Sequence, residues 1–129
     1  MQQKLVVIVR WKALLSALEA SKHTFPDEFI GLFRGTEKKG VLRLNELIIP
    51  PFSTYHEDWA GYSPWFLPPK MDCLASFHSH TRGPALPSRE DLRNFAGMGR
   101  AHFISVPPFT PESTNCFDST GRKIVFELK

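Results

Sequence analysis

The chain has 129 residues and a formal net charge of +3, and 42% of its residues are hydrophobic and 22% charged. These values predict one soluble globular domain over residues 1–129, large enough for a sizeable core. The basic residues are scattered, which argues against a nucleic-acid partner. The apolar run Leu5–Val9 is too short to span a membrane and lacks the cleavage pattern of a signal peptide. We therefore expect a cytoplasmic protein without a nucleic-acid or membrane partner.

The first half of the chain predicts a strand, a helix and a hairpin. Lys4–Val9 is rich in β-branched residues and predicts a strand. Residues 10–22 change to a helical period, which predicts an amphipathic helix. Its expected core face carries Trp11, Leu14, Leu15 and Leu18. Asp27–Arg34 and Val41–Ile49 predict the two strands of a hairpin, which turns at Glu37–Gly40.

Residues 52–70 lack a clear period and are rich in aromatic residues, proline and glycine. A loop of this length in a compact domain is usually functional. Its aromatic side chains either cover an edge of the core or form a surface for a substrate or for a second copy of the chain in a homodimer. The sequence leaves these interpretations open.

The second half of the chain predicts further strands around a second helix. Met71–His80 predicts a strand, and the helix over 88–98 has Leu92, Phe95 and Ala96 as its expected apolar face. Ala101–Val106 predicts another strand, and Thr114–Asp118 and Lys123–Leu128 predict a closing hairpin. This order of elements predicts a mixed sheet with helices packed on it, in the α/β to α+β range.

The two cysteines, Cys73 and Cys116, are too few for a disulfide framework. We therefore expect two buried thiols. A bridge between them would be more plausible in a protein from a hyperthermophile.

The candidate chemistry lies at the end of the strand Met71–His80. Because strand side chains alternate between faces, His78 and His80 project to the same side, about 7 Å apart at their roots. Ser88 follows His80 after seven residues, and Asp91 follows three later. Catalytic zinc is typically held by three protein ligands, such as two imidazoles and a carboxylate, and keeps a fourth coordination position open. The alternative is structural, because Ser88-x-x-Asp91 is also the pattern of a capping box.

Other families with a His-x-His pattern fit less well. Cupins place a Glu four or five residues after the second His, whereas the first Glu after His80 is Glu90, and the distant His102 has no such surroundings. Metallo-β-lactamase-like sites continue with x-Asp-His, which is absent here. Amidohydrolase barrels have the motif near the start of a much longer chain.

The complete pattern resembles the JAMM (MPN+) metalloprotease family. His78-Ser79-His80, seven residues and then Ser88-x-x-Asp91 match its signature. The family also has an upstream Glu followed by a Gly-Leu pair, which Glu28-Phe29-Ile30-Gly31-Leu32 matches, 50 residues before His78. Without the resemblance, this Glu could not be chosen over Glu37, Glu46 or Glu57. The resemblance implies an MPN/JAMM domain, a cytidine-deaminase-like mixed β-sheet flanked by helices.

The resemblance also implies a mechanism. His78, His80 and Asp91 would bind Zn²⁺, with water as the fourth ligand, whose pKa zinc lowers to about 7. Glu28 would act as general base and then protonate the leaving amine. Ser88 would donate a hydrogen bond to the oxyanion.

Three functions follow as expectations from the resemblance. The first is a zinc-dependent isopeptidase that cleaves after the C-terminal Gly-Gly of ubiquitin-like modifiers. The second is a peptidase that processes the C-terminus of a sulfur-carrier protein and releases cysteine. The third is a non-catalytic scaffold of the MPN− type, which is disfavoured because such proteins generally lose ligands. A Gly-Gly tail is thin and extended, so a narrow groove beside a strand edge can admit it.

Overall fold

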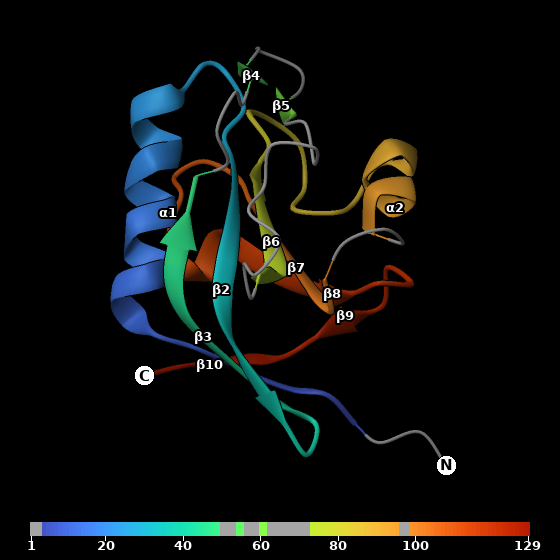
Figure 1. The fold of residues 1–129 in the computed structure, drawn as a ribbon. Helices are drawn as coiled ribbons and strands as arrows, with labels where there is room; N and C mark the ends of the chain where they lie inside the picture. The colour runs from blue at the N-terminus through green and yellow to red at the C-terminus, as the bar shows by residue number, and fades with distance from the viewer. Residues whose placement is uncertain (1–3, 50–53, 56–59, 62–72, 96–98) are drawn as a thin grey trace.

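The computed structural model describes residues 4–49, 54–55, 60–61, 73–95 and 99–129. Figure 1 shows a twisted sheet with one helix on each side. The elements follow in the order β1 (Val6–Val9), α1 (Trp11–Thr24), β2 (Ile30–Lys38), β3 (Val41–Ile48), β4 (Thr54–Tyr55), β5 (Ala60–Gly61), β6 (Cys73–Ser79), α2 (Arg89–Phe95), β7 (Ala101–Ser105), the 3₁₀ helix η2 (Pro111–Ser113), β8 (Thr114–Asp118), β9 (Lys123–Ile124) and β10 (Phe126–Leu128).

The main sheet has eight strands in the order β10-β1-β3-β2-β6-β7-β8-β9. Strand β1 is parallel to both β10 and β3, and β6 is parallel to β7. The pairs β2–β3, β2–β6, β7–β8 and β8–β9 are antiparallel. The sheet is therefore mixed, as the order of the predicted elements indicates.

The closing hairpin differs from the prediction. Only Lys123–Ile124 pairs with β8, whereas Phe126–Leu128 pairs with β1 at the other edge of the sheet. One residue, Val125, separates β9 from β10, so the twisted sheet curls until its two edges come together. The reason lies in packing, because Phe126 turns inward against Phe103, with ring centroids 5.2 Å apart, while Val125 stays 87% exposed.

Strands β2 and β3 form a hairpin, and β2 is the strand that follows Glu28 in the sequence. Lys39 and Gly40 both have positive φ, 52° and 77°, and Lys38 pairs directly with Val41. A two-residue turn with two positive φ angles matches the twist of the flanking strands. The turn lies where it was predicted, but β2 begins at Ile30 instead of Asp27 and extends to Lys38.

Helix α1 packs on the sheet face that carries the main core. Phe33, Phe77 and Phe103 are fully buried there with Leu14 and Leu18 of the helix. The predicted core face of α1 is only half correct, because Trp11 is 44% and Leu15 38% exposed. Ala13, Ala17 and Ser21 are buried instead. These small side chains let the helix lie close to the sheet, which rotates the larger ones outward.

Helix α2 covers the opposite face of the sheet (Figure 1). Its buried side chains are Asp91 and Phe95, and Phe95 belongs to a second apolar cluster with Ala85, Ile104 and Phe117. The expected apolar face is wrong at Leu92, which is 37% exposed. Ala96 and the rest of the predicted helix end, 96–98, lie outside the described residues.

Several expectations concern segments of which little is described. Within the predicted aromatic loop 52–70, the structure describes only the two-stranded pairing of β4 with β5. Its proposed role as a substrate or homodimer surface therefore stays a prediction. The two cysteines are not joined in a disulfide, and Cys116 is buried as expected, whereas Cys73 is only half-buried. No helix among the described residues is long and apolar enough to cross a membrane.

Candidate metal centre

The end of β6 carries the two predicted histidine ligands. His78 is 6% exposed and pairs with Ile30 of β2, and His80 follows directly after the strand. Burial lowers the pKa of His78 to about 4, against the opposing charge of Asp91. The imidazole is therefore neutral at physiological pH, as a metal ligand must be.

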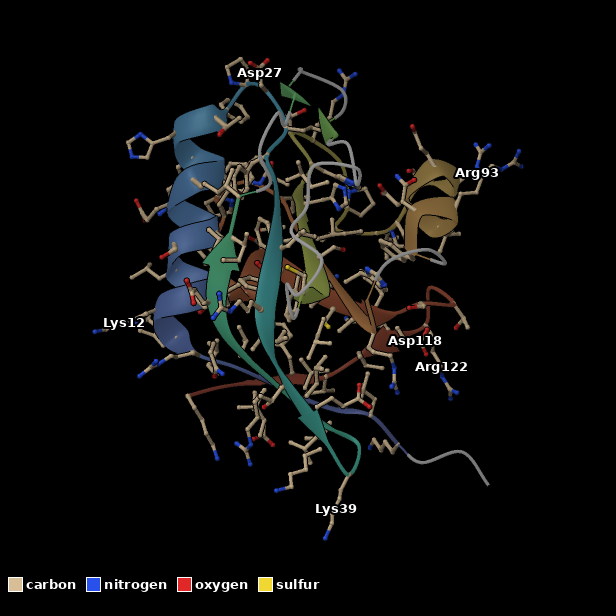
Figure 2. All side chains as sticks on the ribbon, in the orientation of Figure 1. Lys12, Asp27, Lys39, Arg93, Asp118 and Arg122 are labelled. Atoms are coloured by element: carbon tan, nitrogen blue, oxygen red, sulfur yellow. The ribbon has the colours of Figure 1, made fainter. Side chains whose placement is uncertain are left out.

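Glu28 lies opposite His80 across the β2–β6 pairing. The Phe29 N–H donates to Ser79 Oγ at 2.7 Å, and the Ser79 N–H donates to the Phe29 carbonyl at 2.9 Å. These bonds continue the antiparallel register beyond Ile30 and His78. The half-buried Glu28 then falls on the face of the histidines, and its carboxylate contributes to raising the pKa of His80. Figure 2 labels its neighbour Asp27 at this end of the sheet.

Ser88 and Asp91 form the predicted capping box at the start of α2. The Asp91 N–H donates to Ser88 Oγ at 3.1 Å, and the Ser88 N–H donates to Asp91 Oδ2 at 2.8 Å. The same Oδ2 lies 3.1 Å from His80 Nε2. The capping box is therefore confirmed, and Asp91 is also a neighbour of His80. Its role as a metal ligand stays a prediction that this geometry permits.

The pKa values of this pair reflect two opposed effects. Burial alone would raise the pKa of Asp91, but its hydrogen bonds to His80 and to the Ser88 backbone lower it to about 2. Burial alone would lower the pKa of His80, but the hydrogen bond and charge of Asp91 raise it above 6.5. The carboxylate is therefore fully ionised at neutral pH and available as an oxygen donor.

The donor set suits zinc, which accepts imidazole nitrogen and carboxylate oxygen. Within the described residues, His78 Nδ1 is a buried polar atom without a hydrogen-bond partner, and a cation bound at this nitrogen would satisfy it. As they stand, no three His, Cys, Asp or Glu side chains of the described part converge in metal-binding geometry. The His80 and Asp91 donors instead bond to each other, a contact that metal binding would replace.

A third histidine on this face was missed as a functional candidate. His102 of β7 is fully buried, and Ser76, the partner of its Nδ1, lies on the same face of β6 as His78. His102 shares a face of β7 with Ile104, which pairs with His78, so it lies on the side of the predicted ligands. Its contacts with α2 and β6 depend on long-range packing and are not visible in the sequence.

Comparisons with known proteins agree with this architecture. The family model described as "Prokaryotic homologs of the JAB domain" matches residues 12–119. A protein of Haloferax volcanii named "Probable metalloprotease" is 36% identical over 90% of this chain and 75% of its own length. The range that the family model covers contains all five residues singled out by the sequence pattern.

Solved structures share the fold. A JAB1/MPN domain protein from Archaeoglobus fulgidus superposes with a TM-score of 0.71 and 31% identity, covering 93% of this chain and 96% of its own. A structure described as a JAMM metalloprotease-like zinc site in the proteasome and signalosome gives 0.67 and 32%, covering 98% and 99%. A solution structure from Desulfitobacterium hafniense, 17% identical over 96% and 93%, shows the fold alone with a TM-score of 0.70.

Proposed function

Because the chain belongs to the prokaryotic JAB-domain family and is a metalloprotease of the JAMM type, we propose that it is a zinc-dependent isopeptidase. Its proposed substrates are proteins joined to a lysine through the C-terminal Gly-Gly of a ubiquitin-like modifier. The observation that carries the proposal is the meeting of three segments at one end of the sheet: Glu28 opposite His80, and His80 hydrogen-bonded to Asp91.

The proposed metal ligands are His78, His80 and Asp91. They come from the end of β6 and from the first turn of α2, the helix that packs on the face to which these histidines point. Zinc bound there would supply a Lewis acid that polarises the scissile carbonyl and acidifies water. Two neutral imidazoles and one carboxylate leave a net positive centre, which favours developing negative charge on the substrate oxygen.

Glu28 is the proposed general base and acid. Its backbone position opposite His80 supports a carboxylate beside the proposed ligands that is not itself a ligand. A carboxylate in this position can accept a proton from the attacking water and pass it to the leaving lysine amine. Glu28 is half-buried, so its carboxylate keeps access to the water and amine that this role requires.

Ser88 is the proposed donor to the oxyanion. Its Oγ accepts a hydrogen bond from the Asp91 N–H, which uses a lone pair and leaves the hydroxyl proton available. The residue is exposed at the start of α2, where a substrate carbonyl can reach it. Ser88 can therefore cap the helix and stabilise the transition state with different parts of one hydroxyl group.

The proposed substrate class fits an extended and narrow tail. A Gly-Gly segment has no side chains beyond hydrogen, so it can approach the end of a sheet where bulkier residues would be excluded. The related structure described as a JAMM metalloprotease-like zinc site in the proteasome and signalosome supports a zinc site on this fold. Which modifier is recognised depends on residues outside this centre.

The decisive experiment compares wild type with Glu28→Ala. Zinc content is measured on both, and both are incubated with a lysine-linked conjugate of a Gly-Gly-tailed modifier and, separately, with a modifier that carries a C-terminal cysteine extension. We expect about one zinc per chain in both proteins. We expect cleavage of the lysine conjugate by wild type alone, slowed by about 10²–10⁴ in the variant.

Each alternative outcome has a distinct meaning. Equal cleavage by Glu28→Ala and wild type would show that Glu28 is not the base. Preferential release of cysteine would favour processing of a sulfur-carrier protein. Zinc binding without cleavage of either substrate would favour a scaffold. Glu37→Ala, an exchange of an acidic residue near the far end of β2, is the matched control and should cleave at the wild-type rate.

A further inference from the structure

His102 contacts three separate parts of the chain beside the candidate centre. Its ring stacks on Phe95 of α2, with centroids 4.0 Å apart and ring planes inclined by 7°. Its Nδ1 lies 2.7 Å from Ser76 Oγ on β6, and its Nε2 lies 3.1 Å from Ser119 Oγ, just after β8. The residue is fully buried, so these contacts hold the imidazole in one position.

The hydrogen bonds fix which nitrogen carries the proton. Ser119 Oγ donates to the Gly99 carbonyl at 3.0 Å, which uses its only hydrogen. It must therefore accept from the His102 Nε2–H, which leaves Nδ1 to accept from the Ser76 hydroxyl. Both ring nitrogens are satisfied in one neutral tautomer. Among the amino acids, only neutral histidine combines one ring donor and one ring acceptor with an aromatic face that can stack.

Two of the residues that His102 contacts, Phe95 and Ser76, lie on the same elements and the same sides as proposed ligands. Phe95 lies four residues after Asp91, one turn along α2, and these are the two side chains of α2 that are buried against the sheet. Figure 2 shows Arg93, between them in sequence, pointing away from the sheet. Ser76 lies two residues before His78, on the same face of β6. His102 thus joins the helix that carries one ligand to the strand that carries the others.

We propose that His102 is a positioning residue that sets the separation between Asp91 and the two histidines, and through it the affinity of the centre for zinc. This inference rests on the proposed function. His102 does not touch the metal site itself; it acts through Phe95 on the helix and through Ser76 on the strand. Residues that hold metal ligands in place typically change metal affinity by about 10–100-fold when replaced.

The test replaces His102 by leucine, which fills a similar volume but removes the stack and both hydrogen bonds. Zinc affinity is measured by competition with a chromophoric chelator, and the visible spectrum of the Co²⁺-loaded protein reports ligand geometry. We expect His102→Leu to lose at least about tenfold in zinc affinity and to change the Co²⁺ spectrum. Circular dichroism and thermal unfolding establish that the variant is folded.

The matched control is Phe103→Leu, one residue along the same strand. Phe103 is also fully buried, but it packs against Phe33 and Phe126 on the opposite face of the sheet. Its replacement destabilises β7 without changing a contact to α2 or β6 on the side of the centre. We expect a lower unfolding temperature with the zinc affinity and Co²⁺ spectrum of wild type.

The outcomes separate this inference from the proposed function. Wild-type zinc affinity in His102→Leu would overturn the inference alone, and so would equal losses in His102→Leu and Phe103→Leu, because destabilisation would then explain both. A wild-type protein that binds no zinc would overturn both proposals. If His102→Leu does not fold, Ser76→Ala and Phe95→Leu each remove one of the contacts. Wild-type zinc affinity in both of these variants would again overturn the inference.

Discussion

The two faces of the sheet are built from the same strands but hold different chemistry. Toward α1, neighbouring strands contribute Phe33, Phe77 and Phe103, whose rings pack edge to face with centroids 5.4–6.1 Å apart. Toward α2, the alternate residues of β6 and β7 are Ser76, His78 and His102. The apolar cluster on that side is much smaller. Adjacent residues of one strand therefore point to the core on one face and to the candidate centre on the other.

This difference indicates how the fold tolerates a polar centre. The α1 face provides most of the apolar burial, at about 25 cal/mol per Å², and its buried serines and threonine satisfy their hydroxyls locally, as Thr114 does with Ser105. The α2 face can then bury histidines and an aspartate, of which His102 and Asp91 are held by hydrogen bonds. We expect substitutions on the α1 face to change stability, and substitutions on the α2 face to change metal binding and activity.

Asp91→Ala should produce the largest effect on the α2 face. The substitution removes a proposed ligand, so we expect zinc affinity to fall by more than about 100-fold and cleavage to reach the metal-free level. Loss of one capping bond should cost the metal-free protein only about 0.5–2 kcal/mol of unfolding free energy. Zinc content and urea unfolding in chelator measure the two effects separately.

Glu90→Ala is the control for Asp91→Ala. Glu90 is an exposed acidic residue in the same first turn of α2, so it contributes a similar favourable charge to the helix end. We expect it to keep zinc. Retention of full zinc binding by Asp91→Ala would remove this carboxylate from the ligand set and leave it with the capping role alone.

Ser88→Ala should produce an intermediate effect that distinguishes catalysis from capping. We expect kcat to fall by about 10²–10³ through loss of the oxyanion donor, with zinc affinity retained. The free energy of unfolding should fall by about 1 kcal/mol. Ser88→Thr keeps both the hydroxyl and the cap and should recover most of the rate. A kcat for Ser88→Ala close to that of wild type would restrict this serine to its structural role.

The sequence was enough to predict the part of the candidate centre that lies within one short segment, residues 78–91. Alternation along β6 was enough to place His78 and His80 on one face, and the Ser-x-x-Asp spacing predicted the capping box that the structure confirms. Glu28 was chosen only through the family resemblance. The reason is physical: its place opposite His80 depends on the pairing of β2 with β6, in which Ile30 pairs with His78, 48 residues later in the sequence.

The features that the sequence did not predict depend on packing between distant segments. The crossing of β10 to the far edge depends on the burial of Phe126, and the exposure of Trp11 depends on the close approach of α1 through alanine. Likewise, the role of His102 depends on Phe95 and Ser76, which reach it from another helix and another strand. Local periodicity carries no information on such partners.

The smallest expected effect is a pH dependence of stability that originates on the α2 face. Burial, with a further contribution from His78, lowers the pKa of His102 to about 4. In the unfolded chain this histidine titrates near 6.5, so between about pH 6.5 and 4 the unfolded state binds more protons than the folded state. Acidification through this range should therefore destabilise the folded protein, and the stabilising contribution of neutral His102 should be fully present above pH 6.5.

Because His78 titrates in the same direction and His80 in the opposite one, the contribution of His102 is best isolated by comparing variants. Urea unfolding in chelator at pH 7 and pH 5 gives the loss of stability for wild type, His102→Leu and Phe103→Leu. We expect a smaller loss in His102→Leu, which has no titrating group at this position, and the wild-type loss in Phe103→Leu. An equal loss in all three proteins would show that His102 is as readily protonated in the folded chain as in the unfolded one, and that the α2 face buries it less strictly than its contacts indicate.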